Sequence, residues 1–375
     1  MVTGILRNAY SIASIGSHRI KSEDTSGMLL FLADEPNAEN ERDGMSQRIK
    51  WVDDQFQEVP RLILRISLTR NWRRRRIVRS NALVVERLNL FLHLPWVIYL
   101  GLRSKFVYVH SCHHALPGLI LYFLGLRIIT DVHGVVPEEM RLRGYRVRSL
   151  LLSIVERVVV DRSDALIFVT DSMRSHFRRK YAMRDDLRTY IIPIITDELR
   201  PRGLKKEPGL VIYAGGLQGW QRVDRMLDAI ERTGNRFRFI FLTGSPDSLR
   251  HQLDSRGMAQ VEVDSVPRHS IFEYYDRASL GFVLRDDSLV NRVACPTKLV
   301  EYMCAGIIPI VEQPLIGDFY EMGYEYILVD EFESAEVPSL EELENMRNHN
   351  FEVAQDLQEL SRSEFLKMKV HYIGK

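Results

Sequence analysis

The chain has 375 residues, enough for two domains, and its 45% hydrophobic and 27% charged residues are typical of a soluble globular protein. A formal net charge of +1 gives the whole molecule no argument for binding nucleic acid. The three cysteines, Cys112, Cys295 and Cys304, are odd in number and lack a metal-site spacing. They favour a reducing compartment and exclude a disulfide framework.

The first half of the chain alternates apolar, strand-like runs with helical patterns. Residues 1–16 lack the charged, apolar and small-residue order of a signal peptide. The clearest helical patterns cover residues 149–162 and 172–181. The predicted strands are residues 28–33, 61–67, 106–110, 127–130, 165–169 and 189–193.

Positive charge is concentrated in residues 61–110, which hold eleven Arg or Lys and one acid, Glu86. Within this block, Arg73, Arg74, Arg75 and Arg76 follow Trp72 and precede an apolar segment, residues 88–102. That segment is shorter than the roughly 20 residues of a membrane span. Arginines beside interfacial aromatics suit the surface of an anionic membrane. A solvated arm over a core helix is the alternative, and a nucleic-acid patch is disfavoured because no array of stacking aromatics accompanies the arginines.

The second half of the chain repeats the alternation after a polar linker, residues 197–209. Its predicted strands are residues 210–215, 238–244, 260–264, 280–284, 307–311 and 326–329, and residues 340–372 are helical and charged. Such alternation predicts parallel sheets covered by helices on both faces. We therefore predict an α/β fold of two Rossmann-like, doubly wound domains, residues 1–203 and 204–345, that face a cleft. A helical tail, residues 346–375, is expected to pack back towards the first domain.

A predicted helix near residues 296–305 carries two charges in an otherwise apolar sequence. Pro296 and Thr297 begin it, and Gly306 suits its end. Lys298 lies in the first turn, where free N–H groups and the helix dipole attract phosphate. Glu301 shares its face about 4.5 Å further along, where a carboxylate can accept hydrogen bonds from a ribose. These two features suit a nucleoside diphosphate, and the alternative is a solvated ion pair.

Loops after other predicted strands carry further candidates, since ligands of open parallel sheets bind beyond the carboxyl ends of strands. His110, His113 and His114 suggest a metal cluster, but no carboxylate or cysteine shares a ligand spacing with them. The acids Asp286 and Asp287 are interpreted as an exposed loop. No cofactor and no metal are expected. No G-x-G-x-x-G pattern follows a strand, which disfavours a dehydrogenase.

The order of these loops resembles that of glycosyltransferases of the GT-B fold, in particular the retaining enzymes of family 4. The resemblance covers nearly the whole chain and is strongest in "VIYAGGLQGWQRVDRMLDAI" (211–230) and "RDDSLVNRVACPTKLVEYMCAGIIPIV" (285–311). "PTKLVEYMCAG" and "GGLQGWQ" look like a subgroup of bacterial surface-polysaccharide enzymes. Two departures stand out. The first glutamate of the family's motif is absent, because its position is taken by Val293. The family's basic pair is also absent, because its positions are taken by Gly216 and Gln221.

The resemblance implies roles for individual residues. His133 would lie near the donor sugar as the catalytic residue, with helix capping as its alternative role. Gly44 would approach the donor diphosphate. The alternative is a turn glycine, with Arg48 a surface charge. His113 and Glu138 would lie in the acceptor or sugar region, with Glu138 and Glu139 otherwise favouring a helix start. The donor nucleotide would contact Gly44, Gly215, Gly216, Gln221, Arg222, Gly244, Pro296, Thr297, Lys298 and Glu301.

We therefore predict transfer of a sugar from a nucleotide sugar to a glycan or lipid-linked acceptor in polysaccharide biosynthesis (a capsule or O-antigen, for example), with retention of configuration. The predicted location is cytoplasmic, peripheral at the inner face of the cell membrane, and nucleic acid is not an expected partner. A non-catalytic assembly subunit, or an epimerase or phosphorylase of the same fold, remains an alternative.

Overall fold

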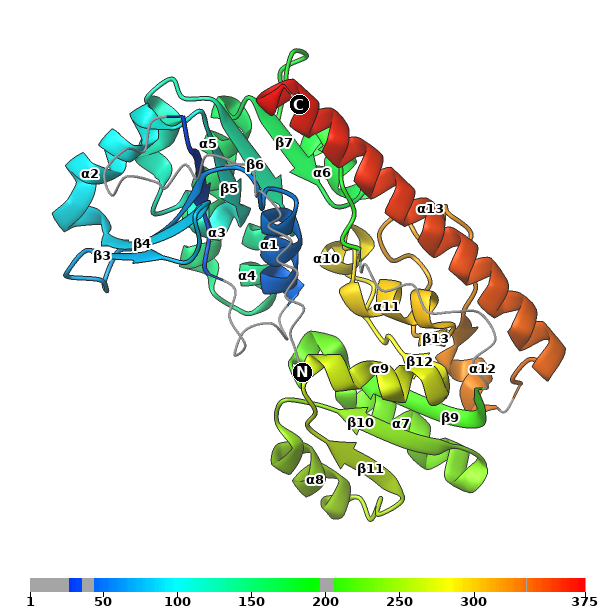
Figure 1. Cartoon of the computed structure of the whole chain (residues 1–375). Helices are drawn as coiled ribbons and strands as arrows, with labels where there is room; N and C mark the ends of the chain where they lie inside the picture. The colour runs from blue at the N-terminus through cyan, green and yellow to red at the C-terminus, as the bar shows by residue number, and fades with distance from the viewer. Residues whose placement is uncertain (1–26, 36–43, 196–205, 335, 375) are drawn as a thin grey trace, which may run out of the picture.

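The computed structural model describes residues 27–35, 44–195, 206–334 and 336–374. They form two lobes, each built on one sheet: the first lobe is residues 27–195 and the second lobe is residues 206–334 (Figure 1). The border predicted at residues 203 and 204 lies outside the described residues, and the domain limits stay a prediction. Among the described residues, no helix is long and apolar enough to cross a bilayer.

The first sheet has eight strands in the order β3-β4-β2-β1-β5-β6-β7-β8, and only β3 runs antiparallel to its neighbour. Its strands are β1 (Leu29–Leu32), β2 (Arg61–Ser67), β3 (Arg75–Val78), β4 (Leu83–Asn89), β5 (Phe106–His110), β6 (Ile128–Val132), β7 (Ala165–Phe168) and β8 (Arg188–Ile191). The helices are α1 (Gly44–Asp54), α2 (Leu90–Arg103), α3 (Ser111–Ala115), η1 (Leu119–Phe123), α4 (Val136–Leu142), α5 (Arg146–Arg162) and α6 (Asp171–Lys180).

The second sheet has six strands in the order β11-β10-β9-β12-β13-β14, all parallel. Its strands are β9 (Glu207–Ala214), β10 (Arg238–Leu242), β11 (Val261–Asp264), β12 (Ala278–Phe282), β13 (Ile308–Val311) and β14 (Ile327–Leu328). The helices are η2 (Gly219–Gln221), α7 (Val223–Thr233), η3 (Gly234–Arg236), α8 (Pro246–Ser255), α9 (Arg268–Arg277), α10 (Leu289–Arg292), α11 (Thr297–Ala305) and α12 (Val329–Glu333). In both sheets the strand order reverses beside the first strand, at β1/β5 and at β9/β12. Such reversals are where doubly wound sheets bind ligands.

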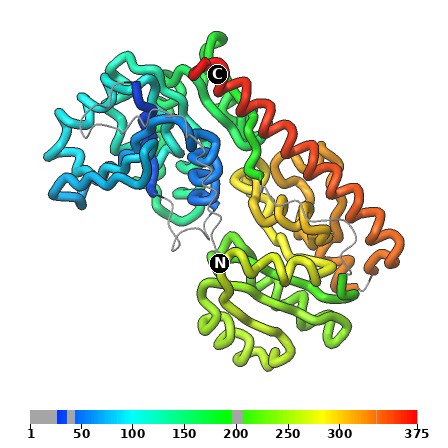
Figure 2. Tube along the Cα trace, in the orientation of Figure 1, coloured from blue at the N-terminus to red at the C-terminus, as the bar shows by residue number. Residues whose placement is uncertain are grey.

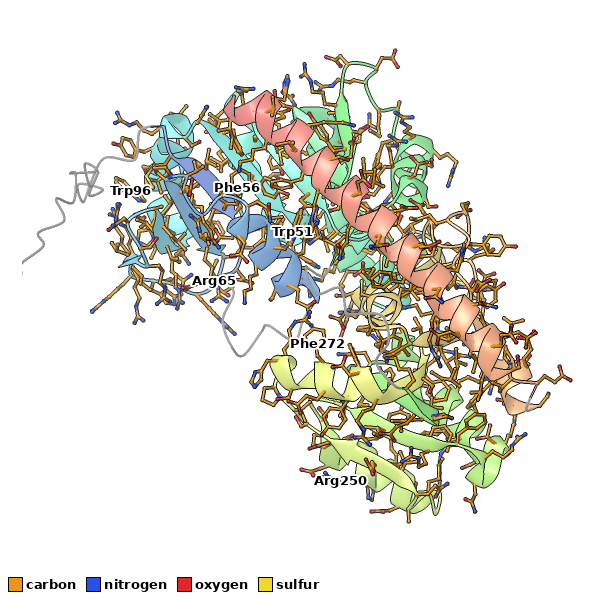
Figure 3. The ribbon with its side chains drawn as sticks, turned by 45° about the vertical axis from the view of Figure 1, so that its right-hand side comes forward. Trp51, Phe56, Arg65, Trp96, Arg250 and Phe272 are labelled. Atoms are coloured by element: carbon orange, nitrogen blue, oxygen red, sulfur yellow. The ribbon has the colours of Figure 1, made fainter. Side chains whose placement is uncertain are left out.

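The long helix α13 (Leu340–Ile373) runs from the second lobe back along the first (Figure 2). Its Phe365 ring packs edge-on against Trp51 of α1 at 5.1 Å and against Phe56 at 5.5 Å (Figure 3). The Lys369 ammonium donates to the carbonyl of Gln55 at 2.8 Å. Because α13 also packs against α11 and β13, it joins the cores of both lobes.

Direct hydrogen bonds also join the lobes. The Asp318 carboxylate of the second lobe accepts from the backbone N–H groups of Asp171 and Ser172, at 2.5 and 2.8 Å, at the start of α6. The Thr170 hydroxyl donates to the carbonyl of Val293 at 2.7 Å. An acid at a helix N-terminus meets unsatisfied donors and the positive end of the dipole. These contacts hold the two lobes together, with the carboxyl ends of the strands in one lobe facing those in the other.

The segment between β2 and β5 differs from the prediction of a basic arm followed by one apolar helix. Residues 75–78 and 83–89 form β3 and β4, and only residues 90–103 are helical, with a kink at His93 just before Pro95. Glu86, on β4, is fully buried and pairs with Arg76 at 3.0 Å. The buried carboxylate therefore draws Arg76, which is 17% exposed, out of the expected basic patch, whereas Arg73, Arg74 and Arg75 stay exposed.

Candidate functional site

A cavity of about 1100 Å³ lies between the lobes. Its walls are loops that follow β5, β6, β9, β10 and β12, together with the starts of α1 and α11. It therefore occupies the strand ends where ligands of doubly wound sheets bind. The lining contains these residues predicted from the sequence: Gly44, His113, His133, Gly215, Gly216, Gln221, Arg222, Gly244, Pro296, Thr297, Lys298 and Glu301.

Lys298 is held in the cavity wall by the glycine loop after β9. Its ammonium lies 3.8 Å from the ring centroid of Tyr213 and donates to the Gln221 side-chain oxygen at 3.1 Å. A Cβ on Gly215 would lie 2.7 Å from the Lys298 Nζ and 2.9 Å from the Tyr213 hydroxyl, so a larger residue there would displace the ends of these two side chains. Burial, helped by Arg285, holds the pKa of Lys298 well below its usual range. An anion in the cavity would restore the charge of this lysine.

Glu301 lies one turn further along α11, as predicted, and is buried. One carboxylate oxygen accepts from the Tyr275 hydroxyl at 2.9 Å, and the other lies 2.8 Å from the Arg268 guanidinium. Neither partner is Lys298, so the solvated ion pair between Lys298 and Glu301 is excluded. The carboxylate is fixed in place with acceptor capacity facing the cavity.

Two helices begin at the same wall of the cavity. A Cβ on Gly44, the first residue of α1, would lie 3.1 Å from the Thr297 hydroxyl at the start of α11. The positive ends of both helices therefore point towards one region. The Arg285 guanidinium adds a second cation there, donating to the Asn291 side chain at 2.8 Å. Arg285 was not predicted, although it directly follows the predicted strand 280–284 and the rule that ligands bind at strand ends would have indicated it.

Arg222 and Val293 are two positions that the resemblance places at the donor site, and neither presents a free charge to the cavity. Arg222 lines the cavity, but its guanidinium forms a double hydrogen bond with Glu312, at 2.6 and 2.9 Å. Val293, at the position of the missing glutamate, is 3% exposed and belongs to the core. Among the described residues that line the cavity, Lys298 and Arg285 are therefore better placed than Arg222 to meet an anion.

His133 lies at the first-lobe side of the cavity and contacts a buried network. Its Nε2 is 3.2 Å from an oxygen of Asp131, which also accepts from the Tyr108 hydroxyl at 2.7 Å. Arg48 is 1% exposed and donates to both oxygens of Asp131, at 3.0 and 3.4 Å. Arg48 is therefore not a surface charge. It fixes the carboxylate, and the carboxylate lies beside the His133 ring.

The same network decides how well a metal would fit. His110, Asp131 and His133 bring possible ligand atoms within 4.8 Å of one another. The Asp131 oxygens already accept from Tyr108 and from the Arg48 guanidinium, which would repel a cation. The donor set suits an ion-pair network better than a divalent metal.

Glu138 and Glu139, two adjacent acids at the start of α4, face different surroundings. Glu139 lines the cavity, and burial raises the pKa of its carboxyl. Glu138 does not line it and instead pairs with Lys180 at 2.8 Å, near His176. Hydrogen bonds from His176 and Lys180 outweigh burial and lower the pKa of Glu138 to about 2. Of the two acids, only Glu139 faces the cavity, and the sequence could not decide between adjacent helix positions.

The four arginines predicted to face a membrane lie far along the first sheet, at or just before the edge strand β3. Arg74 stacks on Trp96 at 4.0 Å and, like Arg76, lies near Glu86, at 3.6 and 3.0 Å. Arg73 and Arg75 are exposed. None of the four lines the cavity.

Neither a protein-family model nor a curated protein matches the chain. Solved structures do. HepE of Anabaena in complex with UDP and glucose superposes with a TM-score of 0.68, at 13% identity over 92% of this chain and 99% of that one. Sucrose-phosphate synthase of Thermosynechococcus elongatus gives 0.64, at 13% identity over 92% and 98%. An α,α-trehalose-phosphate synthase (UDP-forming) of Burkholderia vietnamiensis gives 0.62, at 13% identity over 92% and 98%. The chain has the GT-B fold of these glycosyltransferases.

Proposed function

We propose that the chain is a glycosyltransferase that uses a nucleotide-sugar donor. One observation carries the proposal: Lys298 and Glu301 share one face of α11 and line the same cavity as the glycine loop after β9. Lys298 would meet the diphosphate and Glu301 the ribose. The neighbouring HepE structures contain UDP or UDP-glucose, which favours a uridine nucleotide as the donor.

The chemistry requires stabilisation of the leaving group. The bond between the sugar's anomeric carbon and the diphosphate oxygen breaks, and its electron pair leaves with the nucleotide. The acceptor hydroxyl forms the new bond and loses its proton. Preorganised donors aimed at the developing charge lower the barrier. Here they are Lys298, Arg285 and the N-terminal amides of α11. His133 and Glu139 face the region beyond them, where the sugar would lie.

We further propose a glycan or lipid-linked acceptor, polysaccharide biosynthesis and retention of configuration, as the resemblance of the loops implies. Attachment to the inner face of the cell membrane would suit a lipid-linked acceptor. A non-catalytic assembly subunit is the second candidate. It is favoured by the buried Val293 and by Arg222 being bound to Glu312, because both remove groups expected at the donor.

Two measurements test the proposal. A thermal-shift panel of UDP-, GDP-, CDP- and dTDP-sugars should show stabilisation by one nucleotide class, with UDP expected. With that donor, His133→Ala should depress the rate of transfer or donor hydrolysis more than it weakens nucleotide binding, because its contact matters as charge develops. Nucleotide binding without any turnover in the wild type would favour the non-catalytic subunit. No binding of any nucleotide would refute the proposal.

A further inference from the structure

The outer face of α5 is apolar although nothing in the described chain covers it. Val147, Leu150, Leu151 and Ile154 are 76%, 66%, 54% and 56% exposed. Their spacing of i, i+3, i+4 and i+7 places them in one stripe along the helix. The opposite face carries Leu152, Val155, Val159 and Val160 into the core. The outer stripe is therefore not needed for folding of the lobe, and four large exposed aliphatics in a row indicate a contact surface.

The charges around this stripe have one sign. Residues 141–155 contain Arg141, Arg143, Arg146 and Arg148 and no acid. All four arginines are exposed. Tyr145, 58% exposed, lies among them. An apolar stripe bordered by arginines and a tyrosine matches an interface with anionic headgroups, where the side chains enter the acyl boundary and the guanidinium groups meet phosphate.

The stripe continues to both ends of α5. At the carboxyl end, the Arg162 guanidinium stacks at 5.3 Å on Phe123 of η1, which is 53% exposed. At the amino end, Leu142 and Arg143 line the cavity, and Arg143 stacks on Trp220 of the second lobe at 4.4 Å. A bilayer against α5 would therefore meet the mouth of the cavity.

We propose that the face formed by residues 141–154 binds an anionic phospholipid bilayer and presents the cavity mouth to the membrane surface. The occupant follows from the charges: a second copy of this chain would bring the same arginines together and repel itself. The arginine block at residues 73–76 is the weaker site, because Arg74 and Arg76 lie near the buried Glu86. This inference does not depend on the proposed sugar transfer.

Co-sedimentation of the full chain with vesicles tests the proposal. We expect binding to phosphatidylcholine vesicles that contain phosphatidylglycerol, weaker binding in high salt, and little binding to pure phosphatidylcholine. Each basic residue at an anionic surface contributes roughly fivefold to partitioning. Arg146→Gln/Arg148→Gln should therefore weaken binding about 25-fold, and Leu150→Ser/Leu151→Ser at least about tenfold.

A matched control is Leu366→Ser/Val370→Ser, which removes two exposed apolar residues from α13. It should bind vesicles like the wild type. All variants should keep the wild-type melting temperature and UDP affinity, which separates membrane binding from nucleotide binding. The proposal is overturned if the wild type binds neither vesicle. It is equally overturned if only Arg73→Ser/Arg75→Ser reduces binding, or if Leu150→Ser/Leu151→Ser converts a dimer in solution to a monomer.

Discussion

Lys298 gives the sharpest test of the nucleotide site. With the cavity empty, burial and the neighbouring Arg285 hold its pKa well below the usual range. A diphosphate would add negative charge beside it and raise that pKa, so nucleotide binding should take up a proton. The affinity should be highest below the pKa of the free state and should fall as the pH rises through it.

The size of the effect follows from the geometry. A unit charge pair about 4 Å apart at an effective dielectric of about 20 attracts by about 4 kcal/mol. Part of this is lost in desolvation, and a hydrogen bond to a charged group leaves a net of about 1.5–3 kcal/mol. Lys298→Met keeps the aliphatic stem against Tyr213 and removes the charge. It should weaken UDP binding about tenfold to a hundredfold.

Titration calorimetry with UDP, in buffers of different ionisation enthalpy, measures the affinity and the protons taken up. The variant should lose both the affinity and the proton uptake. Arg222→Ala is the control, because its guanidinium is bound to Glu312 and should leave UDP affinity nearly unchanged. Equal affinity and equal proton uptake in Lys298→Met and the wild type would place the diphosphate elsewhere.

Four further outcomes are expected. Glu301→Gln should weaken UDP binding by at least about tenfold but leave a nucleotide without ribose hydroxyls unaffected in calorimetry; equal losses for both ligands would remove the ribose contact. Glu139→Gln should raise the melting temperature near neutral pH and not near about pH 4, since a carboxyl whose pKa is raised on folding destabilises above its unfolded value. Glu138→Gln should lower the melting temperature near neutral pH, because it removes about 1–2 kcal/mol of stability after allowance for solvent screening. Since the pKa of Glu138 is lowered to about 2, the difference from the wild type should vanish towards that pH. A shift of the melting temperature in the same direction for the Glu138 and Glu139 variants would contradict these roles. Asp131→Asn should lower the free energy of unfolding in urea by about 3–5 kcal/mol, because it leaves the guanidinium of Arg48 buried without an anion; a loss below about 1 kcal/mol, within the range of an exposed ion pair, would show that the pair is not the anchor of this network.

The parallel sheets were predictable because fully buried strands leave continuous apolar runs. β5 matches its predicted range, and the strands of the second sheet differ from theirs by a few residues at most. β3 was missed because two of its four residues are arginines and it lies on a sheet edge, where exposure permits charge. β4 was missed because it passes directly into α2, so that strand and helix form one apolar run in the sequence. The GT-B fold itself is confirmed, but its subdivision into a family is not.

Site residues were predictable where the backbone alone places them at the cavity. They were less predictable where the direction of the side chain determines which group they contact. Gly215 and Lys298 were indicated by a strand end and a helix start, which position residues regardless of packing. The partner of Arg222 could not be predicted, since Glu312 is 90 residues away. The choice between Glu138 and Glu139 depends on which side of α4 meets Lys180, a contact set by the packing of α6.

The helix α13 has a consequence for how the chain folds during synthesis. The first lobe is made first, yet Trp51, Phe56 and Phe106 are covered by Phe365 and Tyr372. These contacts span roughly 300 residues, so they form only after α13 has been synthesised, and such long-range contacts form slowly. A nascent chain halted before α13 should expose Trp51 to a fluorescence quencher. Until α13 packs, the first lobe carries an uncovered apolar surface at these aromatic residues, and a chaperone bound there would have to leave before α13 could take its place.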